Sequence, residues 1–304
     1  MRQGLQGGAK PPIERELNMR LPSPLHALAT LGLTGATTAL MTGTALAQAL
    51  EQIGVPTAGG MGFQPASSPT AVQAQALDHM LIIITGVITV FVTGLLLFVI
   101  FRFGAKRNPV PAKFTHNTPV EIAWTLIPIV ILVFIGSFSL PALFYQQEIP
   151  TADVTIKVTG NQWYWHYDYP DALDSKGVPV GFDSVLLDKK DLEANGYQQS
   201  DYLLAADNAL VLPVGKTIVV QLTGADVIHA WAVPAFAVMH SAVPGRLGQL
   251  WFKADKVGVY FGQCTALCGS NHAYMPIVVK VVSEEAYAAW LVTAKGGNYK
   301  LASN

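Results

Sequence analysis

Two long stretches without a charged residue most constrain the fold of this chain. They run from Met80 to Phe101 and from Ile122 to Tyr145, and roughly 20 apolar residues suffice for a helix to cross a bilayer. Because the backbone within hydrocarbon has to hydrogen-bond to itself, each stretch is predicted to be a membrane-spanning helix. The alternative, a helical hairpin buried inside a soluble protein, is disfavoured by the length of both stretches and their complete lack of charge.

Composition and loop charge agree with a membrane protein. Hydrophobic residues make up 51% of the chain and charged residues 13%, with a net charge of −1, a balance that gives no indication of nucleic-acid binding. The segment between the two stretches carries Arg102, Lys106, Arg107 and Lys113 and no acidic residue. Since short basic loops stay in the cytoplasm, both termini, and with them the C-terminal half of the chain, are predicted to lie outside it.

The N-terminal region has the pattern of a secretory leader. Leu25–Ala47 is apolar, rich in small residues, and ends in a small-residue motif suited to cleavage before Gln48. Met19 is an alternative start for this leader. Residues rich in Gly, Pro, Ala and Ser follow it and indicate an extended linker. The predicted order is a signal peptide (1–47), a linker (48–77), a transmembrane hairpin (78–148), an extracytoplasmic domain (149–294) and a tail (295–304).

After Pro150 the pattern changes to short segments with strand-like alternation, beginning with Val154, Ile156 and Val158. Gly160-Asn161 is expected to introduce a bulge, because the large residues change parity after it. The segment Asp174–Asp207 is polar and is expected to be an irregular insertion. Many short strands with turn residues between them predict an all-β sandwich. Further strands are expected at 163–169, 209–214, 217–222, 247–252, 258–264 and 275–282, and a closing helix at 283–294.

The two cysteines of the chain lie in one short string with other metal-binding side chains: Cys264, Cys268, His272 and Met275, with His229 upstream. A disulfide or a structural zinc site would each account for part of this set. Thiolate, imidazole and thioether together favour copper, since zinc sites rarely use Met. The string contains no evident acid, base or substrate pocket, which points to electron storage rather than substrate chemistry.

Several motifs resemble subunit II of the haem–copper cytochrome c oxidases, of the bacterial type. The string from Gly262 to Pro276 is similar to the loop of that family's binuclear copper centre, CuA, and Asp226-Val-Ile-His229-Ala-Trp is similar to its first-histidine region. Gly160-Asn-Gln-Trp163-Tyr-Trp165 resembles its aromatic segment, and Pro119-Val-Glu121-Ile-Ala-Trp124 the entrance to its second span. The resemblance implies an all-β cupredoxin-like sandwich behind a two-helix transmembrane hairpin.

The resemblance also implies cofactors and partners. Two coppers would be held by His229, Cys264, Cys268, His272, Met275 and the backbone oxygen of Ala266. The subunit would accept electrons from reduced cytochrome c and pass them to subunit I, which holds haem and a further copper, reduces O₂ to water and pumps protons. Subunit III is a further expected partner. The implied location is the bacterial inner membrane, with the soluble domain in the periplasm.

Five further residues acquire roles from the resemblance, each with a structural alternative. Trp163 corresponds to the electron-entry residue, or else is one more aromatic side chain of the sandwich core. Asp168, Asp171 and Asp226 correspond to acids that dock cytochrome c, or are ordinary solvated charges. Glu121 corresponds to the entrance of a proton path, or is a cap at the start of the second helix.

The chain departs from the family pattern around a non-redox metal. The family usually has Glu between the cysteines, which reaches Mg²⁺ or Mn²⁺ at the subunit interface, whereas this chain has Ala266; an Asp usual before Pro244 is replaced by His240-Ser241. We expect this site to be weakened or lost. Alternatives to the oxidase function are a nitrous-oxide reductase, which shares the copper loop but is soluble, and a membrane-anchored copper carrier or assembly protein.

Overall fold

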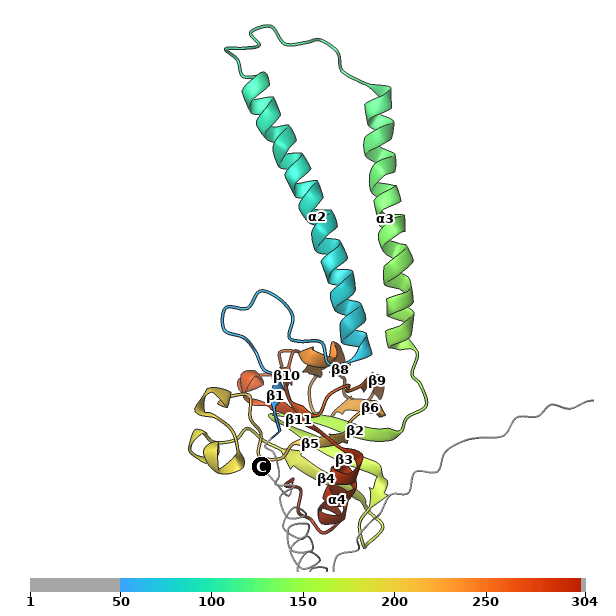
Figure 1. Cartoon of the computed structure of the whole chain (residues 1–304), viewed down its shortest axis with the longest axis vertical. Coiled ribbons are helices and arrows are strands. Elements are labelled where there is room, and N and C mark those ends of the chain that lie inside the picture. Colours follow the sequence, from blue (N-terminus) through green and yellow to red (C-terminus); the bar gives the residue numbers. More distant parts are fainter. Residues whose placement is uncertain (1–49, 302–304) are drawn as a thin grey trace, which may run out of the picture. The chain divides into compact units, whose positions relative to one another are not determined.

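The structure is a computed structural model that describes residues 50–301. The predicted signal peptide and the alternative start Met19 lie outside the described residues. Figure 1 shows two long helices, α2 and α3, followed along the chain by a domain of β-strands that a short helix, α4, closes. The predicted order of a helical hairpin and then an all-β sandwich is therefore confirmed for the described residues.

Helices α2 (Pro69–Arg102) and α3 (Thr118–Gln147) contain the two apolar stretches. Both are long and apolar enough to cross a membrane, and no part of either apolar window is buried within the chain. Such surfaces need lipid or other subunits to cover them, which argues against the soluble-hairpin alternative. Polar caps set their starts: the Ser68 side chain accepts from the Ala71 amide, and that of Asn117 from the Val120 amide.

The predicted linker differs from the structure at both ends. Helix α2 begins at Pro69 rather than near residue 78, and strand β1 (Gln52–Gly54) lies within the segment expected to be extended and unpaired. Ser68-Pro69 is a typical N-cap followed by proline in the first turn, so a local signal for the earlier start was present. The pairing of β1 with residues some two hundred positions later had no local signal.

The β-domain consists of two sheets packed face to face. The first has the strand order β5-β11-β10-β7-β8, with β1 paired in parallel to β10, and the second has the order β4-β3-β2-β6-β9. The first sheet comprises β1, β5 (Leu210–Pro213), β7 (His229–Val233), β8 (Val238–Ala242), β10 (Gly258–Cys264) and β11 (Pro276–Val282). The second comprises β2 (Val154–Asn161), β3 (Tyr164–Leu173), β4 (Pro179–Ser184), β6 (Thr217–Gly224) and β9 (Gly248–Lys253).

Alternating side chains build the core between the sheets. On β2 and β3 the buried positions are Ile156, Val158, Trp165, Tyr167 and Tyr169, as expected for strands with one face turned inward. Helix α4 (Glu284–Lys295) closes one end of the sandwich with a buried Trp290, whose ring lies 5.1 Å from that of Tyr169. The predicted cap of this helix is present: the Ser283 hydroxyl accepts from the Ala286 amide.

The prediction of a β-bulge at Gly160-Asn161 is wrong. Strand β2 ends at Asn161, which pairs with Tyr164 at the start of β3, so Gln162 and Trp163 form a two-residue hairpin loop. The change of parity among the large residues arises because the chain reverses, not because a residue is inserted. This correction matters for the site, since it takes Trp163 out of the strand that holds Trp165.

The segment Asp174–Asp207 is more ordered than predicted. It contains strand β4 and three short 3₁₀ helices, Lys189–Asp191, Glu193–Asn195 and Gln199–Asp201. Leu187, Leu192 and Tyr197 of this segment pack with Val259, Phe261 and Val278 in a small second core. The predicted tail also packs on the domain as far as it is described: the Tyr299 ring lies 4.9 Å from that of Phe182.

Candidate metal centre

The two strands that carry the first His and the first Cys are neighbours in one sheet. His229 is the first residue of β7 and Cys264 the last of β10, and these strands pair antiparallel with Cys264 opposite Trp231. His229 lies on a strand, within a β7–β8 hairpin that is not among the strands predicted from the sequence. Gln263 pairs with Pro276, which closes the loop that carries the remaining donor residues.

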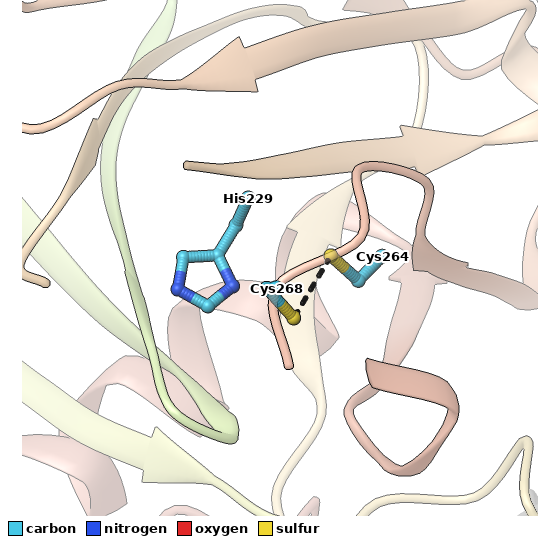
Figure 2. A group of neighbouring side chains, drawn as sticks. All are labelled: His229, Cys264 and Cys268. Atoms are coloured by element: carbon cyan, nitrogen blue, oxygen red, sulfur yellow. Dashed lines mark hydrogen bonds between the residues drawn. The ribbon is translucent and has the colours of Figure 1, made fainter. Parts of the chain in front are cut away.

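The donor atoms converge within one buried region. His229, Cys264 and Cys268 each offer an atom within 4.8 Å of the others, and Figure 2 shows one ring nitrogen of His229 facing the two sulfurs. The sulfurs are 3.9 Å apart, and Cys268 Sγ lies 3.5 Å from both His272 Nδ1 and Met275 Sδ. Cys264 Sγ lies 3.3 Å from the Ala266 carbonyl oxygen.

The disulfide alternative does not fit this arrangement. Both cysteines are free and buried, and 3.9 Å is far beyond the roughly 2 Å of an S–S bond. Burial, together with the charge of the neighbouring Cys264, raises the pKa of the Cys268 thiol to about 12. A thiol with such a pKa stays protonated at neutral pH, so a metal that binds here has to displace a proton.

The imidazole of His229 is oriented by Asp226. Its Nε2 lies 2.9 Å from Asp226 Oδ1. Because a carboxylate only accepts hydrogen bonds, Nε2 carries the hydrogen and donates it to Asp226, which leaves a lone pair on Nδ1. Nδ1 is buried and has no hydrogen-bond partner among the described residues. Gly160 makes room for the ring, because a Cβ there would come within 2.8 Å of His229 Cδ2. A buried acceptor without a partner, next to two thiols, is what a metal ligand requires.

Asp226 is thus more than a surface acid. Its carboxylate also accepts from the backbone amides of Val227 (2.6 Å) and Gln162 (2.7 Å). Burial by itself would raise the pKa of this carboxyl group, but the hydrogen bonds from His229, Val227 and Gln162 outweigh it and lower the pKa below its usual value. The carboxylate therefore stays ionised and fixed against the ring of His229.

Two further contacts hold the ligand loop, and neither could be predicted from a sequence pattern. The Gln162 side chain donates to the Cys268 carbonyl oxygen at 2.8 Å, and the Trp165 indole N–H donates to that of Met275 at 3.2 Å. Both residues belong to the opposite sheet or its hairpin loop. The donor loop is therefore held on one side by its own strands and on the other by the second sheet.

The two tryptophans of the aromatic segment have different surroundings. Trp165 is fully buried in the core, whereas Trp163 is half-buried in the hairpin loop. The Trp163 ring packs on the ligand loop, since a Cβ on Gly269 would lie 2.9 Å from its Cζ2. Trp163 thus lies between the loop that carries the cysteines and the surface.

The remaining predicted site residues lie apart from the cluster. On β3, Asp168 is half-buried and contacts His166 Nε2 (3.2 Å) and Lys157 (3.9 Å), while Asp171 is exposed. Glu121 lies in the first turn of α3, where its carboxylate accepts from the Asn117 amide at 3.0 Å. The capping interaction considered for Glu121 is therefore present.

Two membrane-length helices, a β-sandwich and a buried cluster of two thiols, two imidazoles and a thioether define a membrane-anchored cupredoxin-like protein. Comparison with known proteins identifies the family within this class. The models described as the transmembrane and periplasmic domains of cytochrome c oxidase subunit II match residues 56–142 and 154–282. The chain belongs to the cytochrome c oxidase subunit II family.

Relatives along nearly the whole chain agree. The chain is 57% identical to cytochrome c oxidase subunit 2 of Cereibacter sphaeroides over 290 residues, covering 91% of this chain and 95% of that protein. It is 46% identical to the probable subunit 2 of Rickettsia bellii over 249 residues, covering 80% and 89%. A crystal structure of the periplasmic domain of subunit II from Bradyrhizobium japonicum matches with 49% identity and a TM-score of 0.44, covering 49% of this chain and 99% of that one.

Family membership assigns the general function. The chain is a subunit of a haem–copper terminal oxidase, an oxidoreductase, and the nitrous-oxide reductase and copper-carrier alternatives are set aside. The copper centre implied by the family suits the donor residues, because soft sulfur and imidazole are the ligands that copper prefers.

Proposed function

We propose that this subunit holds the binuclear CuA centre, accepts electrons from reduced cytochrome c and passes them to haem in subunit I. The convergence of two free thiols and the unpartnered Nδ1 of His229 carries this proposal. Bound copper would supply a one-electron carrier. Cys264 and Cys268 would bridge the two ions, His229 and His272 would be the terminal nitrogen ligands, and Met275 and the Ala266 carbonyl would be weak ligands.

The donor set favours copper over zinc. Met275 is 1% exposed, and its sulfur lies beside that of Cys268 rather than in the hydrophobic core alone. A structural zinc site of two Cys and two His would not need a thioether at this distance. With copper, which accepts soft ligands in both oxidation states, the thioether could serve as a ligand.

The surrounding contacts suit repeated electron transfer. Beyond the strand ends, the Thr265 amide donates to the Ala230 carbonyl at 3.1 Å, so the loop is tied to β7 directly after Cys264. With Gln162, Trp165 and Asp226, this gives Cys264, Cys268, Met275 and His229 each a supporting contact from outside the ligand loop. Donors that cannot move keep the geometry nearly the same in both redox states, which lowers the reorganisation that accompanies each transfer.

Reconstitution of the full chain in detergent with copper tests the proposal. The expected result is a purple protein with two coppers per chain and a seven-line electron-spin pattern at low temperature, because one unpaired electron is shared by two equivalent nuclei. A four-line pattern, a zinc-only protein or a disulfide between Cys264 and Cys268 would contradict it.

Electron entry would occur at Trp163, supported by its contact with the ligand loop. Asp168 and Asp171 on β3 would attract a basic cytochrome c. Asp226 is a poor probe of docking, because its substitution would also remove the hydrogen bond that orients the His229 ring. The docking role is therefore best tested without it.

The double variant Asp168→Asn/Asp171→Asn is expected to slow association with cytochrome c on the order of 10-fold at low salt. The difference from the parent should vanish as ionic strength rises, since salt screens exposed charges. Steady-state cytochrome c oxidation against salt concentration measures this. Glu193→Gln, an exposed acid of the segment before β5, is the control and should keep the parent profile. A double variant with an unchanged salt profile would remove both residues from docking.

Glu121 would be the entrance of a proton path, and a pair of variants separates this role from helix capping. Glu121→Gln keeps an oxygen that can accept from the Asn117 amide but cannot carry a proton, whereas Glu121→Ala loses both functions. We expect both variants to slow proton uptake and oxygen consumption while copper reduction by cytochrome c stays normal. If only the Ala variant is impaired, Glu121 acts as a cap, whose loss costs about 1 kcal/mol.

Location and partners follow from the same proposal. The hairpin would lie in the bacterial inner membrane, with the basic loop at Lys106 and Arg107 in the cytoplasm and the sandwich in the periplasm. Large apolar side chains are exposed on β8, before β9 and in the ligand loop: Met239 at 68%, Leu247 at 59% and Leu267 at 83%. Such side chains are suited to contact with subunit I. Subunit III is a further proposed partner.

The interface site for Mg²⁺ or Mn²⁺ would be weak or absent. Ala266 offers no carboxylate, and His240 is held on β8, where its Nδ1 lies 2.9 Å from the Ser241 carbonyl and its ring packs on Gly248. Hard cations prefer carboxylate and carbonyl oxygens, so neither residue replaces the missing acid. An ordinary Mn²⁺ resonance from the assembled oxidase would contradict this.

A further inference from the structure

A small cavity in the β-domain is lined by two lysines and lies apart from the metal cluster. Its volume is about 30 Å³, and its lining includes Lys280 of β11, Lys300, Tyr197 and Asp207. Since a single water needs on the order of 10–15 Å³, the cavity accommodates one or two water-sized species. None of the donor residues of the copper site contributes to it.

Lys280 is a buried lysine of strand β11. It is 6% exposed, and its Nζ lies 5.4 Å from the centre of the Tyr197 ring. Among residues 50–301 it has no carboxylate within ion-pair distance. Burial lowers the pKa of Lys280 to about 8, with the nearby Lys300 contributing. An ammonium removed from water is unfavourable unless an anion or several acceptors replace the solvent.

The other charged groups of the lining do not compensate Lys280. The Lys300 ammonium donates to two neutral oxygens, Asn195 Oδ1 and the Asp207 carbonyl, so it adds a second positive charge. The Asp207 carboxylate accepts at 2.7 Å from the backbone amides of both Val185 and Asn208. These bonds hold the carboxylate on the side of the β4–β5 connection, and it forms no ion pair with Lys280 in the described structure.

We propose that Lys280 and Lys300 form a binding site for one small inorganic anion, of the size of chloride, within this cavity. The two ammonium groups supply the charge, and the cavity volume excludes larger organic anions. An anion there would hold β11, the segment before β5 and the residues after α4 together. The site would stabilise the domain and leave the copper ligands untouched.

Crystals of the assembled oxidase soaked in bromide test the location of the anion. We expect an anomalous peak in contact with Lys280 Nζ, and its loss in Lys280→Met, which keeps the length of the side chain without the charge. The matched control is Lys216→Met, a half-buried lysine that is paired with Glu284 and lies outside the cavity, in which the peak should remain. A carboxylate of the protein bound to Lys280 Nζ in place of bromide would overturn the proposal.

Thermal unfolding of the full chain in detergent tests the consequence. Replacing potassium gluconate by potassium chloride at constant ionic strength should raise the midpoint by about 2–4 °C for a tenfold excess over the dissociation constant. Lys280→Met should lose this response, and Lys216→Met should keep it. A bromide peak without a chloride response, or an undiminished response in Lys280→Met, would indicate an adventitious ion only and would overturn the proposal.

Discussion

Replacing Cys268 by Ser should abolish the entry of electrons into the assembled oxidase. Its sulfur is the centre of the cluster, in contact with the sulfurs of Cys264 and Met275 and with His272 Nδ1. A hydroxyl is a hard and weakly acidic ligand, so it cannot replace a bridging thiolate. Removing even an indirect support of a metal commonly costs 10–100-fold in affinity, so we expect a loss of more than about 100-fold here.

The measurements are the copper content and spin spectrum of the variant and the rate of cytochrome c oxidation by the assembled complex. Thr265→Ala is the matched control, because Thr265 lies in the same loop with an exposed side chain. It should retain both coppers and the parent rate. A Cys268→Ser protein that keeps a seven-line spectrum would exclude Cys268 as a bridging ligand.

The second large effect is expected from Gly262→Ala. A Cβ at Gly262 of β10 would collide with the carbonyl oxygen of Ala232 on β7, and a backbone atom cannot move aside as a flexible side chain can. We expect destabilisation by about 3 kcal/mol, at the upper end for overpacking. The variant should also bind copper more weakly, because Cys264 lies on β10 and His229 on β7.

Thermal unfolding and copper titration of the full chain check this result. Gly62→Ala is the control, since a Cβ at Gly62 has nothing within 4 Å and the residue has no positive φ. Its unfolding midpoint should stay close to that of the parent, whereas Gly262→Ala should fall by roughly 10 °C. If Gly262→Ala kept the parent midpoint and copper affinity, the close approach of β7 and β10 would not hold the centre together.

The elements predicted correctly have strong local signals. Absence of charge marks the two helices, and alternation of apolar and polar residues marks strands such as β2. Strand β4 was missed although Val180, Phe182 and Ser184 alternate, because Gly and Asp residues around them suggested a loop. Strand β7 is buried at every position, so it has no alternation to recognise.

The donor residues were recognisable for chemical reasons, but their arrangement was not. The donor atoms of Cys264, Cys268, His272 and Met275 restrict which metal ions can bind, because they are soft ligands in any fold. Which nitrogen of His229 faces the sulfurs depends on Asp226, and the support of the loop depends on Gln162 and Trp165 of the other sheet. The contacts of Gln162 and Trp165 join residues far apart in the chain, and the short spacing of Asp226 and His229 does not by itself show that their side chains meet.

The sequence by itself determined the membrane hairpin, the sandwich class and the soft ligand set, because hydrophobicity, alternation and donor chemistry are properties of neighbouring residues. The tertiary structure alone decided that Trp163 lies at the ligand loop while Trp165 is in the core, that Asp226 orients His229, and that Lys280 is buried with no carboxylate partner among residues 50–301. These features depend on how the backbone folds, because folding brings Trp163 to the distant Gly269, places the Asp226 carboxylate against the nearby His229 ring, and removes Lys280 from water.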